Sequence, residues 1–369
     1  MKDPRIDRLA NMLVHYSTEI QPGQRVLIHG EWGGEPLLAA IFRECLASGA
    51  YPFVVPYTSD YVDSIFRHGK PEQYPYLLEP FRNLVATYDV RIRILGEENT
   101  REASQFDPDI VSKYYAESGK MTNLMLEREA KGEMKWVLSL FPTQAYAQDA
   151  GMSLADYEDF VFRACMPDDA DPVGYWKRVA ARQDKAIAWL KGKKDVHIAA
   201  PGTDLKLSIE GRPFINCACQ VNVPDGEIFT SPVETSTNGF VHFSYPTLYE
   251  GFEVTGVRLD FRDGRVVNAS ADKGEEFLLK KLDTDEGART LGEFAIGTNE
   301  GIDRFTGQIL FDEKIGGSFH LAVGNGYPES GSQNQSAIHW DMICDLRQGG
   351  EITVDGELFY KDGKFVIPF

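Results

Sequence analysis

The sequence predicts an α/β N-terminal domain with a parallel sheet, followed by a mainly antiparallel β (α+β) C-terminal domain that carries a metal site. Three observations support this fold class. Strand and helix patterns alternate in the first half, Asp-Gly turns join strand-like runs in the second half, and histidines and acids lie on C-terminal strands. Because 369 residues exceed what one hydrophobic core usually supports, we expect two domains. The pattern changes beyond the Lys191–Lys194 run, which places the domains at residues 1–192 and 193–369.

The N-terminal domain begins with apolar residues at helical spacing from Ile6 to Val14, and Pro22-Gly23 ends that helix. The β-α-β alternation that follows predicts a parallel sheet flanked by helices. Strands are expected at 25–30, 51–57, 91–95 and 136–140, and helices at 35–50, 153–165 and 173–191. The turn from His29 to Gly34 lacks the spacing of a phosphate-binding loop, so we expect no nucleotide cofactor. His29 could face a substrate, but a structural role at the helix entry is favoured.

The C-terminal domain is predicted from short strands joined by Gly and Asp turns. Strands are expected at 196–200, 205–209, 254–261 and 265–268. The segments 262–265, 354–357 and 361–364 each carry Asp-Gly, the signal of a tight hairpin. This half is therefore expected to be mostly antiparallel.

The charge and composition exclude several classes of partner. A formal charge of -18 argues against nucleic acid, because phosphates would be repelled, and favours a cationic or neutral small substrate. No stretch is apolar enough for a membrane span, and the N-terminus lacks a signal core. Five scattered cysteines suit reduced thiols, so we expect a cytoplasmic protein. The close pair Cys217 and Cys219 is assigned to core packing.

Two histidines and an aspartate indicate a polar pocket near the C-terminus. In the strand-like segment 336–344, His339 and Asp341 are two residues apart and should share one face, while the apolar residues between and around them face the core. His320 repeats this pattern in segment 317–323. A lone histidine usually satisfies a hydrogen bond at a sheet margin, but two of them beside a carboxylate favour a metal site.

Glu227 and Glu293 are candidates to complete the site. Glu227 closes a Pro-Asp-Gly turn at a strand start, and Glu293 is almost surrounded by apolar residues, although either could be an ordinary turn or cap acid. If both converge on the histidines and Asp341, the ligands outnumber the three that usually hold one catalytic zinc, and a dinuclear site follows. Without thiolate ligands, zinc, cobalt or manganese is expected.

Four segments together resemble the thermophilic-type metallo-aminopeptidases, the aminopeptidase T, aminopeptidase S and PepS family. They are Pro224-Asp-Gly-Glu-Ile-Phe-Thr230, Leu291-Gly-Glu-Phe-Ala-Ile-Gly297, Ile309-Leu-Phe-Asp-Glu-Lys-Ile-Gly-Gly317 with His320, and Ser336-Ala-Ile-His-Trp-Asp-Met-Ile-Cys344. The resemblance is dense over residues 220–369 and diffuse before them.

The resemblance implies hydrolysis of the N-terminal residue of peptide or aminoacyl substrates by a homodimer with two divalent ions. It implies that Glu227, Glu293, His320, His339 and Asp341 are the ligands, that Glu293 also accepts the proton of the attacking water, and that Tyr327 donates a hydrogen bond to the oxyanion. From the sequence alone Tyr327 could equally be an aromatic residue that packs in its loop. Family loops before the last strand tend to read Gly-Gly-Thr-Asn-Lys-Ser, whereas this chain has Gly331-Ser-Gln-Asn-Gln-Ser336, so the substrate preference stays open.

Two other functions compete. His320, His339 and Asp341 alone could form the two-histidine, one-carboxylate triad of a non-haem iron ring-cleaving dioxygenase. Alternatively, the metals could only stabilise a non-catalytic binding protein. Glu227 and Glu293 argue against a simple triad, and the lack of thiolates argues against a closed structural site.

Overall fold

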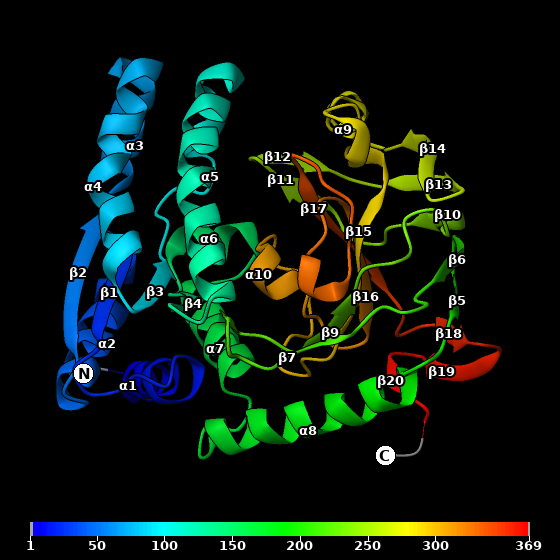
Figure 1. The fold of residues 1–369 in the computed structure, drawn as a ribbon, viewed down its shortest axis with the longest axis horizontal. Coiled ribbons are helices and arrows are strands. Elements are labelled where there is room, and N and C mark those ends of the chain that lie inside the picture. Colours follow the sequence, from blue (N-terminus) through cyan, green and yellow to red (C-terminus); the bar gives the residue numbers. More distant parts are fainter. Residues whose placement is uncertain (1–2, 368–369) are drawn as a thin grey trace. The chain divides into compact units, whose positions relative to one another are not determined.

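The computed structural model describes residues 3–367 and divides into two compact units (Figure 1). The N-terminal unit extends to Val173 and also takes in the returning segment Cys219–Val223. The C-terminal unit comprises Gly174–Ala218 and the chain from Pro224 onward. The first boundary between the units therefore lies between Val173 and Gly174, whereas the sequence pattern placed it at Gly192. The helix that precedes Gly192 belongs almost entirely to the C-terminal unit.

The N-terminal unit is built on a parallel sheet in the order β2–β1–β3–β4–β8, as the β-α-β alternation predicts. Helices α4 and α5 pack against each other, and α1 packs against α2 (Figure 1). Its elements are α1 (Pro4–Met12), η1 (Leu13–Ser17), β1 (Arg25–Glu31), η2 (Trp32–Gly34), α2 (Glu35–Ala47), β2 (Tyr51–Tyr57), α3 (Ser59–His68), η3 (Pro71–Gln73), α4 (Tyr74–Thr87), β3 (Val90–Leu95), η4 (Glu102–Gln105), α5 (Pro108–Ala130), β4 (Lys135–Leu140), α6 (Gln144–Asp149), α7 (Leu154–Cys165) and β8 (Asn222–Val223).

Local sequence explains where several of these helices begin. Asp3 and Asp107 accept hydrogen bonds from backbone N–H groups at the starts of α1 and α5, and a proline follows each of them at the first helical position. Ser153 caps α7 in the same way. The helices α3, α4 and α5 are not predicted by the sequence pattern.

The C-terminal unit contains two antiparallel sheets. One has the order β14–β13–β10–β6–β5–β18–β19–β20, and the other has the order β17–β16–β15–β9–β7. Its elements are α8 (Pro172–Leu190), β5 (Asp195–Ala200), β6 (Thr203–Ser208), β7 (Ile215–Cys217), β9 (Glu227–Thr230), β10 (Asn238–His242), β11 (Thr247–Tyr249), β12 (Phe252–Val254), β13 (Arg258–Arg262), β14 (Arg265–Ser270), α9 (Glu275–Leu282), η5 (Glu286–Arg289), β15 (Leu291–Gly297), α10 (Ile309–Asp312), β16 (Ser318–Gly324), η6 (Pro328–Ser330), β17 (His339–Asp345), β18 (Glu351–Val354), β19 (Glu357–Lys361) and β20 (Lys364–Phe365).

The three Asp-Gly segments all form the predicted tight hairpins, between β13 and β14, β18 and β19, and β19 and β20. In each turn both residues have positive φ, for example 48° at Asp263 and 84° at Gly264. Such a turn has the twist that antiparallel strands need, and Asp-Gly tolerates that backbone geometry well. Along the described chain, no helix combines the length and apolar character needed to cross a membrane.

Candidate metal centre

The candidate ligands lie on one face of the sheet β17–β16–β15–β9–β7. The strand register pairs Glu227 with Gly297, Glu293 with Ala322, and Ala295 with His320, while Asp341 also pairs with Ala322 and His339 with Gly324. Directly paired residues point to the same face, as do residues two apart along a strand. The opposite face carries the apolar side chains that pack into the core, including Phe294, Leu321 and Trp340.

Small residues make room between the ligands. Each candidate ligand has an alanine or a glycine as a partner on one neighbouring strand, which leaves space on that side, while His320 also pairs with Ile343 and Glu227 with Cys217. A bulge at Gly292 shifts the register just before Glu293. A Cβ at Gly292 would lie 2.3 Å from the backbone oxygen of Asn325, so only glycine fits there. The bulge thereby fixes the direction of Glu293.

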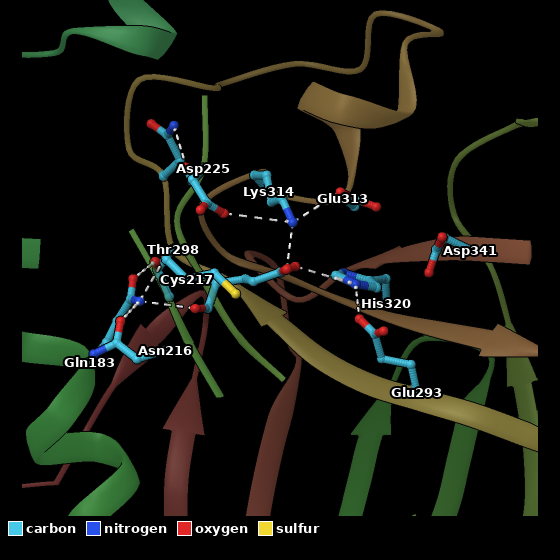
Figure 2. Close-up of polar contacts among 12 residues, drawn as sticks. Gln183, Asn216, Cys217, Asp225, Glu293, Thr298, Glu313, Lys314, His320 and Asp341 are labelled. Carbon is cyan, nitrogen blue, oxygen red and sulfur yellow. Dashed lines mark hydrogen bonds and ion pairs between the residues drawn. The ribbon is translucent and has the colours of Figure 1, made fainter. Parts of the chain in front are cut away.

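The backbone of Glu227 is held on both sides. Gly226 has φ of +113°, and a Cβ there would come within 3.0 Å of Asn299, which explains the glycine of the predicted Pro-Asp-Gly turn. The fully buried Gln183 of α8 donates to the backbone oxygens of Glu227 and Cys217 at 2.9 and 3.0 Å. It accepts a hydrogen bond from the Thr298 hydroxyl at 2.7 Å. Figure 2 shows Gln183, Asn216 and Thr298 in contact.

The structure brings all the predicted ligand residues together. His320 Nε2 lies 3.1 Å from Glu293 Oε1 and 3.5 Å from Glu227 Oε2, and His339 Nε2 lies 3.4 Å from Asp341 Oδ2 and 3.9 Å from Glu293 Oε2. In Figure 2, His320 and Glu293 point toward each other. Apart from His339, which is partly exposed, these side chains are almost wholly buried.

Glu313 and Lys314, at the end of α10, are site residues that the sequence reasoning missed. Glu313 forms a potential ligand group with His320 and Asp341. Lys314 Nζ contacts Glu227 and lies 2.9 Å from Glu313 Oε1 and 3.7 Å from Asp225 Oδ1 (Figure 2). The signal was present in Asp312-Glu-Lys314, where three charges interrupt an apolar run.

Neighbouring groups orient His339. Its Nδ1 lies 2.7 Å from the Asn325 carbonyl, which can only accept, so Nδ1 carries the proton and Nε2 is left to face the carboxylates. The Tyr327 ring meets the His339 ring edge-on, with centroids 5.3 Å apart. Tyr327 is 36% exposed, so this predicted catalytic residue stands at the open side of the cluster.

The donor set fits divalent cations. Among the described residues, Glu227 Oε2 and Asp341 Oδ1 are buried and have no hydrogen-bond partner. Buried oxygens of this kind are normally satisfied, and coordination of a metal would satisfy them. Burial, and then the nearby Asp225 and Glu227 carboxylates, raise the pKa of the Cys217 thiol well above its ordinary value, so the thiol is protonated in the metal-free protein.

Without metal, protons occupy the histidines. Burial alone would lower the pKa of His320, but the hydrogen bond to Glu293 and the charges of Glu227 and Glu293 raise it to about 9. Burial is likewise outweighed at His339, where Asp341 raises the pKa to about 10. Burial would raise the pKa of Asp341, yet His339 lowers it to about 2. The metal-free cluster is therefore an imidazolium and carboxylate network at neutral pH.

Metal uptake is expected to release protons and to strengthen as the pH rises. Because both histidine pKa values are raised, both imidazoles are protonated below about pH 9, and a cation must displace those protons. We expect zinc affinity, measured by competition with a chromophoric chelator, to rise about tenfold or more per pH unit between about pH 6 and pH 8.

One variant and one control test whether the histidines of the cluster cause this dependence on pH. His339→Gln should reduce the slope, whereas His197→Gln should not, since His197 is a surface histidine paired with Asp204. A zinc affinity that does not change with pH would contradict the protonated cluster.

The similarity to known proteins extends over nearly the whole chain. Residues 2–365 match the family model described as thermophilic metalloprotease (M29). Aminopeptidase 2 of Geobacillus stearothermophilus is 28% identical, over 98% of this chain and 95% of its own length. The solved structure of wild-type AmpT from Thermus thermophilus has a TM-score of 0.86 at 21% identity and covers 99% of both chains. A 2,5-dihydroxypyridine dioxygenase from Pseudomonas putida KT2440 has a TM-score of 0.61 at 14% identity, over 98% of this chain and 97% of its own. At these identities the two structural matches show a shared fold alone, and the AmpT match supports the predicted fold class.

Proposed function

This chain belongs to the thermophilic metalloprotease family M29, and from that premise we propose that it is a metal-dependent aminopeptidase, a hydrolase that removes the N-terminal residue of peptides. One observation carries the proposal beyond family membership: Glu227, Glu293, His320, His339 and Asp341 meet on one sheet face. A triad-based iron dioxygenase would require only His320, His339 and Asp341 of this set, and it leaves the buried Glu227 and Glu293 unexplained.

We propose two ions, held by these residues with Glu313 as an added candidate ligand. Lys314 pairs with Asp225, Glu227 and Glu313, and the carboxylates of Glu293 and Asp341 belong to the same cluster. Two divalent cations would balance the negative charge that the single lysine leaves. The carboxylate and imidazole donors favour zinc, cobalt or manganese. When bound, such ions supply Lewis-acid polarisation of the scissile carbonyl and lower the pKa of water.

The chain's own residues supply the remaining chemistry. Glu293 is placed between both histidines, and burial raises its pKa, which suits a carboxylate that accepts a proton from water. Tyr327 keeps its phenol protonated, since burial and the charges of Glu293 and Asp341 raise its pKa well above the ordinary value. It would therefore donate a hydrogen bond to the oxyanion that develops at the carbonyl. The acidic surroundings favour a substrate with a free α-ammonium group.

We also propose that the protein is cytoplasmic and acts as a homodimer. The five cysteines are all free thiols, as expected in a reducing compartment. Strands β7 and β17 end their sheet, and such edge strands are places where a second copy could pack.

A peptidase assay tests the proposed activity. Protein loaded with zinc, cobalt or manganese should release the first residue from peptides with a free N-terminus but not from the same peptides after N-acetylation. Chelation should abolish turnover, and readdition of the metal should restore it, because the carboxylate cluster alone has no group to polarise the carbonyl. If the folded, metal-loaded protein cleaves no peptide in a broad panel, the proposal fails. One iron per chain with oxygen uptake on an aromatic substrate would favour the dioxygenase instead.

A further inference from the structure

The N-terminal unit contains a cavity of about 390 Å³ that includes none of the candidate metal ligands. It lies between the carboxyl ends of β1, β2 and β3 and the helices α3, α4 and α5. In this sheet β2 lies on one side of β1 and β3 lies on the other, so the direction in which successive strands are placed reverses at β1. The crevice at the carboxyl ends beside such a switch point is where open α/β sheets commonly bind ligands. Its volume is at the small end of the roughly 300–1,000 Å³ typical of small-molecule sites.

Two arginines bring positive charge to this cavity without a paired carboxylate. Arg91 is 6% exposed, and it donates to His29 Nε2 at 2.9 Å and to the Met125 sulfur at 2.8 Å, both neutral acceptors. Burial, and then the Arg91 charge, lower the pKa of His29 well below its ordinary value, so His29 stays neutral. Arg93 Nε is buried and has no hydrogen-bond partner among the described residues. Neither guanidinium is in ion-pair contact with a described carboxylate, although a buried charge normally requires such a partner.

The acids Glu31 and Glu97 line the cavity near Arg93 and stabilise its charge, but neither forms an ion pair with it. Glu31 accepts a hydrogen bond from the Tyr57 hydroxyl, and its second oxygen accepts one from the Gly96 N–H at 2.9 Å. Glu97 is the other acid near Arg93. Burial, and then the charge of Glu31, raise the pKa of Glu97 to about 7, although the charge of Arg93 acts in the opposite direction. The cavity therefore presents a buried guanidinium with a free Nε donor and a nearby acid with which it makes no direct ion pair.

The neighbouring glycine loop does not form a phosphate site. A Cβ at Gly33 would lie 2.4 Å from the backbone oxygen of Gly96, and a Cβ at Gly96 would lie 2.5 Å from the Gly34 nitrogen. The glycines thus serve the close packing of the β1–α2 loop against the end of β3.

We propose that this cavity binds a free α-amino acid with a large apolar side chain, whose carboxylate meets Arg93 and whose ammonium meets Glu97. Aromatic and apolar residues of the helices, including Phe66, Phe81 and Tyr115, form the wall that would receive the side chain. A ligand with both charges would give Arg93 a carboxylate, and Glu97 an ammonium group, in direct contact. The inference does not depend on the proposed peptidase activity.

Calorimetric titration of the full-length protein with L-phenylalanine and L-leucine tests the site. We expect saturable binding to the wild type, and a loss of about tenfold to a hundredfold in affinity in Arg93→Gln, the range for losing a hydrogen bond to a charged group. Glu97→Gln should weaken binding in the same direction. Arg43→Gln is the matched control, because Arg43 is an exposed arginine of the same unit that pairs with Asp7. Thermal unfolding of each variant shows that it is folded.

Further ligands and one further variant separate this site from the metal centre. 3-Phenylpropionate, which lacks the amine, and phenethylamine, which lacks the carboxylate, should each bind at least about tenfold more weakly than phenylalanine. Glu293→Gln should bind phenylalanine as the wild type does. The proposal is overturned if the wild type shows no saturable binding, if folded Arg93→Gln binds normally, or if 3-phenylpropionate binds as well as phenylalanine. Amino-acid binding in a protein without peptidase activity would refute the proposed function and leave this inference standing.

Discussion

Glu293→Gln is expected to lower kcat by about a hundredfold or more, the scale of removing a general base, while the protein keeps at least part of its metal. The amide has the shape of the carboxylate, and one oxygen remains to face His320, but it cannot take the proton of the attacking water. Glu293 approaches both His320 and His339, so it occupies the middle of the cluster rather than its edge. Steady-state kinetics and elemental analysis on the same preparation measure the two quantities.

Glu300→Gln is the matched control for that variant. Glu300 is an exposed acid shortly after the same strand, and it pairs with Arg182 at the surface, so its loss should leave both turnover and metal content unchanged. Near-normal turnover in Glu293→Gln would remove Glu293 from the mechanism. Loss of turnover together with all metal would instead show that Glu293 acts only as a ligand.

Lys314→Met is expected to lower the free energy of unfolding of the metal-free protein by about 3–5 kcal/mol, the usual cost of removing one partner from a buried ion pair. Lys314 is 2% exposed and contacts the carboxylates of Glu227 and Glu313, with Asp225 nearby. Methionine fills a similar volume but leaves these acids without their shared cation. Chemical denaturation after treatment with a chelator measures the effect.

Two controls accompany Lys314→Met: the addition of metal, and the substitution of a lysine at the surface. Divalent cations should recover part of the lost stability, because they bring positive charge to the same carboxylates. Lys361→Met removes an exposed lysine that lies 3.6 Å from Glu351 and should change stability by less than about 0.5 kcal/mol. A loss below about 1 kcal/mol in Lys314→Met would mean that the acids hold protons instead of depending on the lysine.

The C-terminal strands could be predicted because their patterns are local. Alternation placed His339 and Asp341 on one face and Trp340 and Met342 in the core, and both placements hold in β17. The Asp-Gly hairpins depend on only two residues each. The position of Glu227 beside the other ligands could not be derived from a local pattern, because it depends on pairing between distant strands. In the structure, the register of β9, β15 and β16 brings these residues together.

Other features had no periodic pattern from which their structure could be predicted. Glu313 follows α10, a helix of one turn that is too short to show periodicity. Helix α5 buries only Met125 among its 23 residues, so it has no continuous apolar face to detect. Strand β8 consists of Asn222 and Val223, which pair with β4 far earlier in the chain. Such pairings are decided by tertiary packing rather than by propensity.

The amide of Gln183 ties the first acid of the cluster to a helix far upstream of it. Cutting the chain at residue 193 to isolate the ligand-bearing half would discard α8, and with it the donor to the Glu227 carbonyl and the acceptor for Thr298. The shortened protein would retain every candidate ligand but would lose the hydrogen bonds of Gln183 that hold the backbone of Glu227 in place. The smallest autonomous fragment therefore has to begin before Pro172, and truncation experiments that start later would measure damage to the scaffold and not the chemistry of the ions.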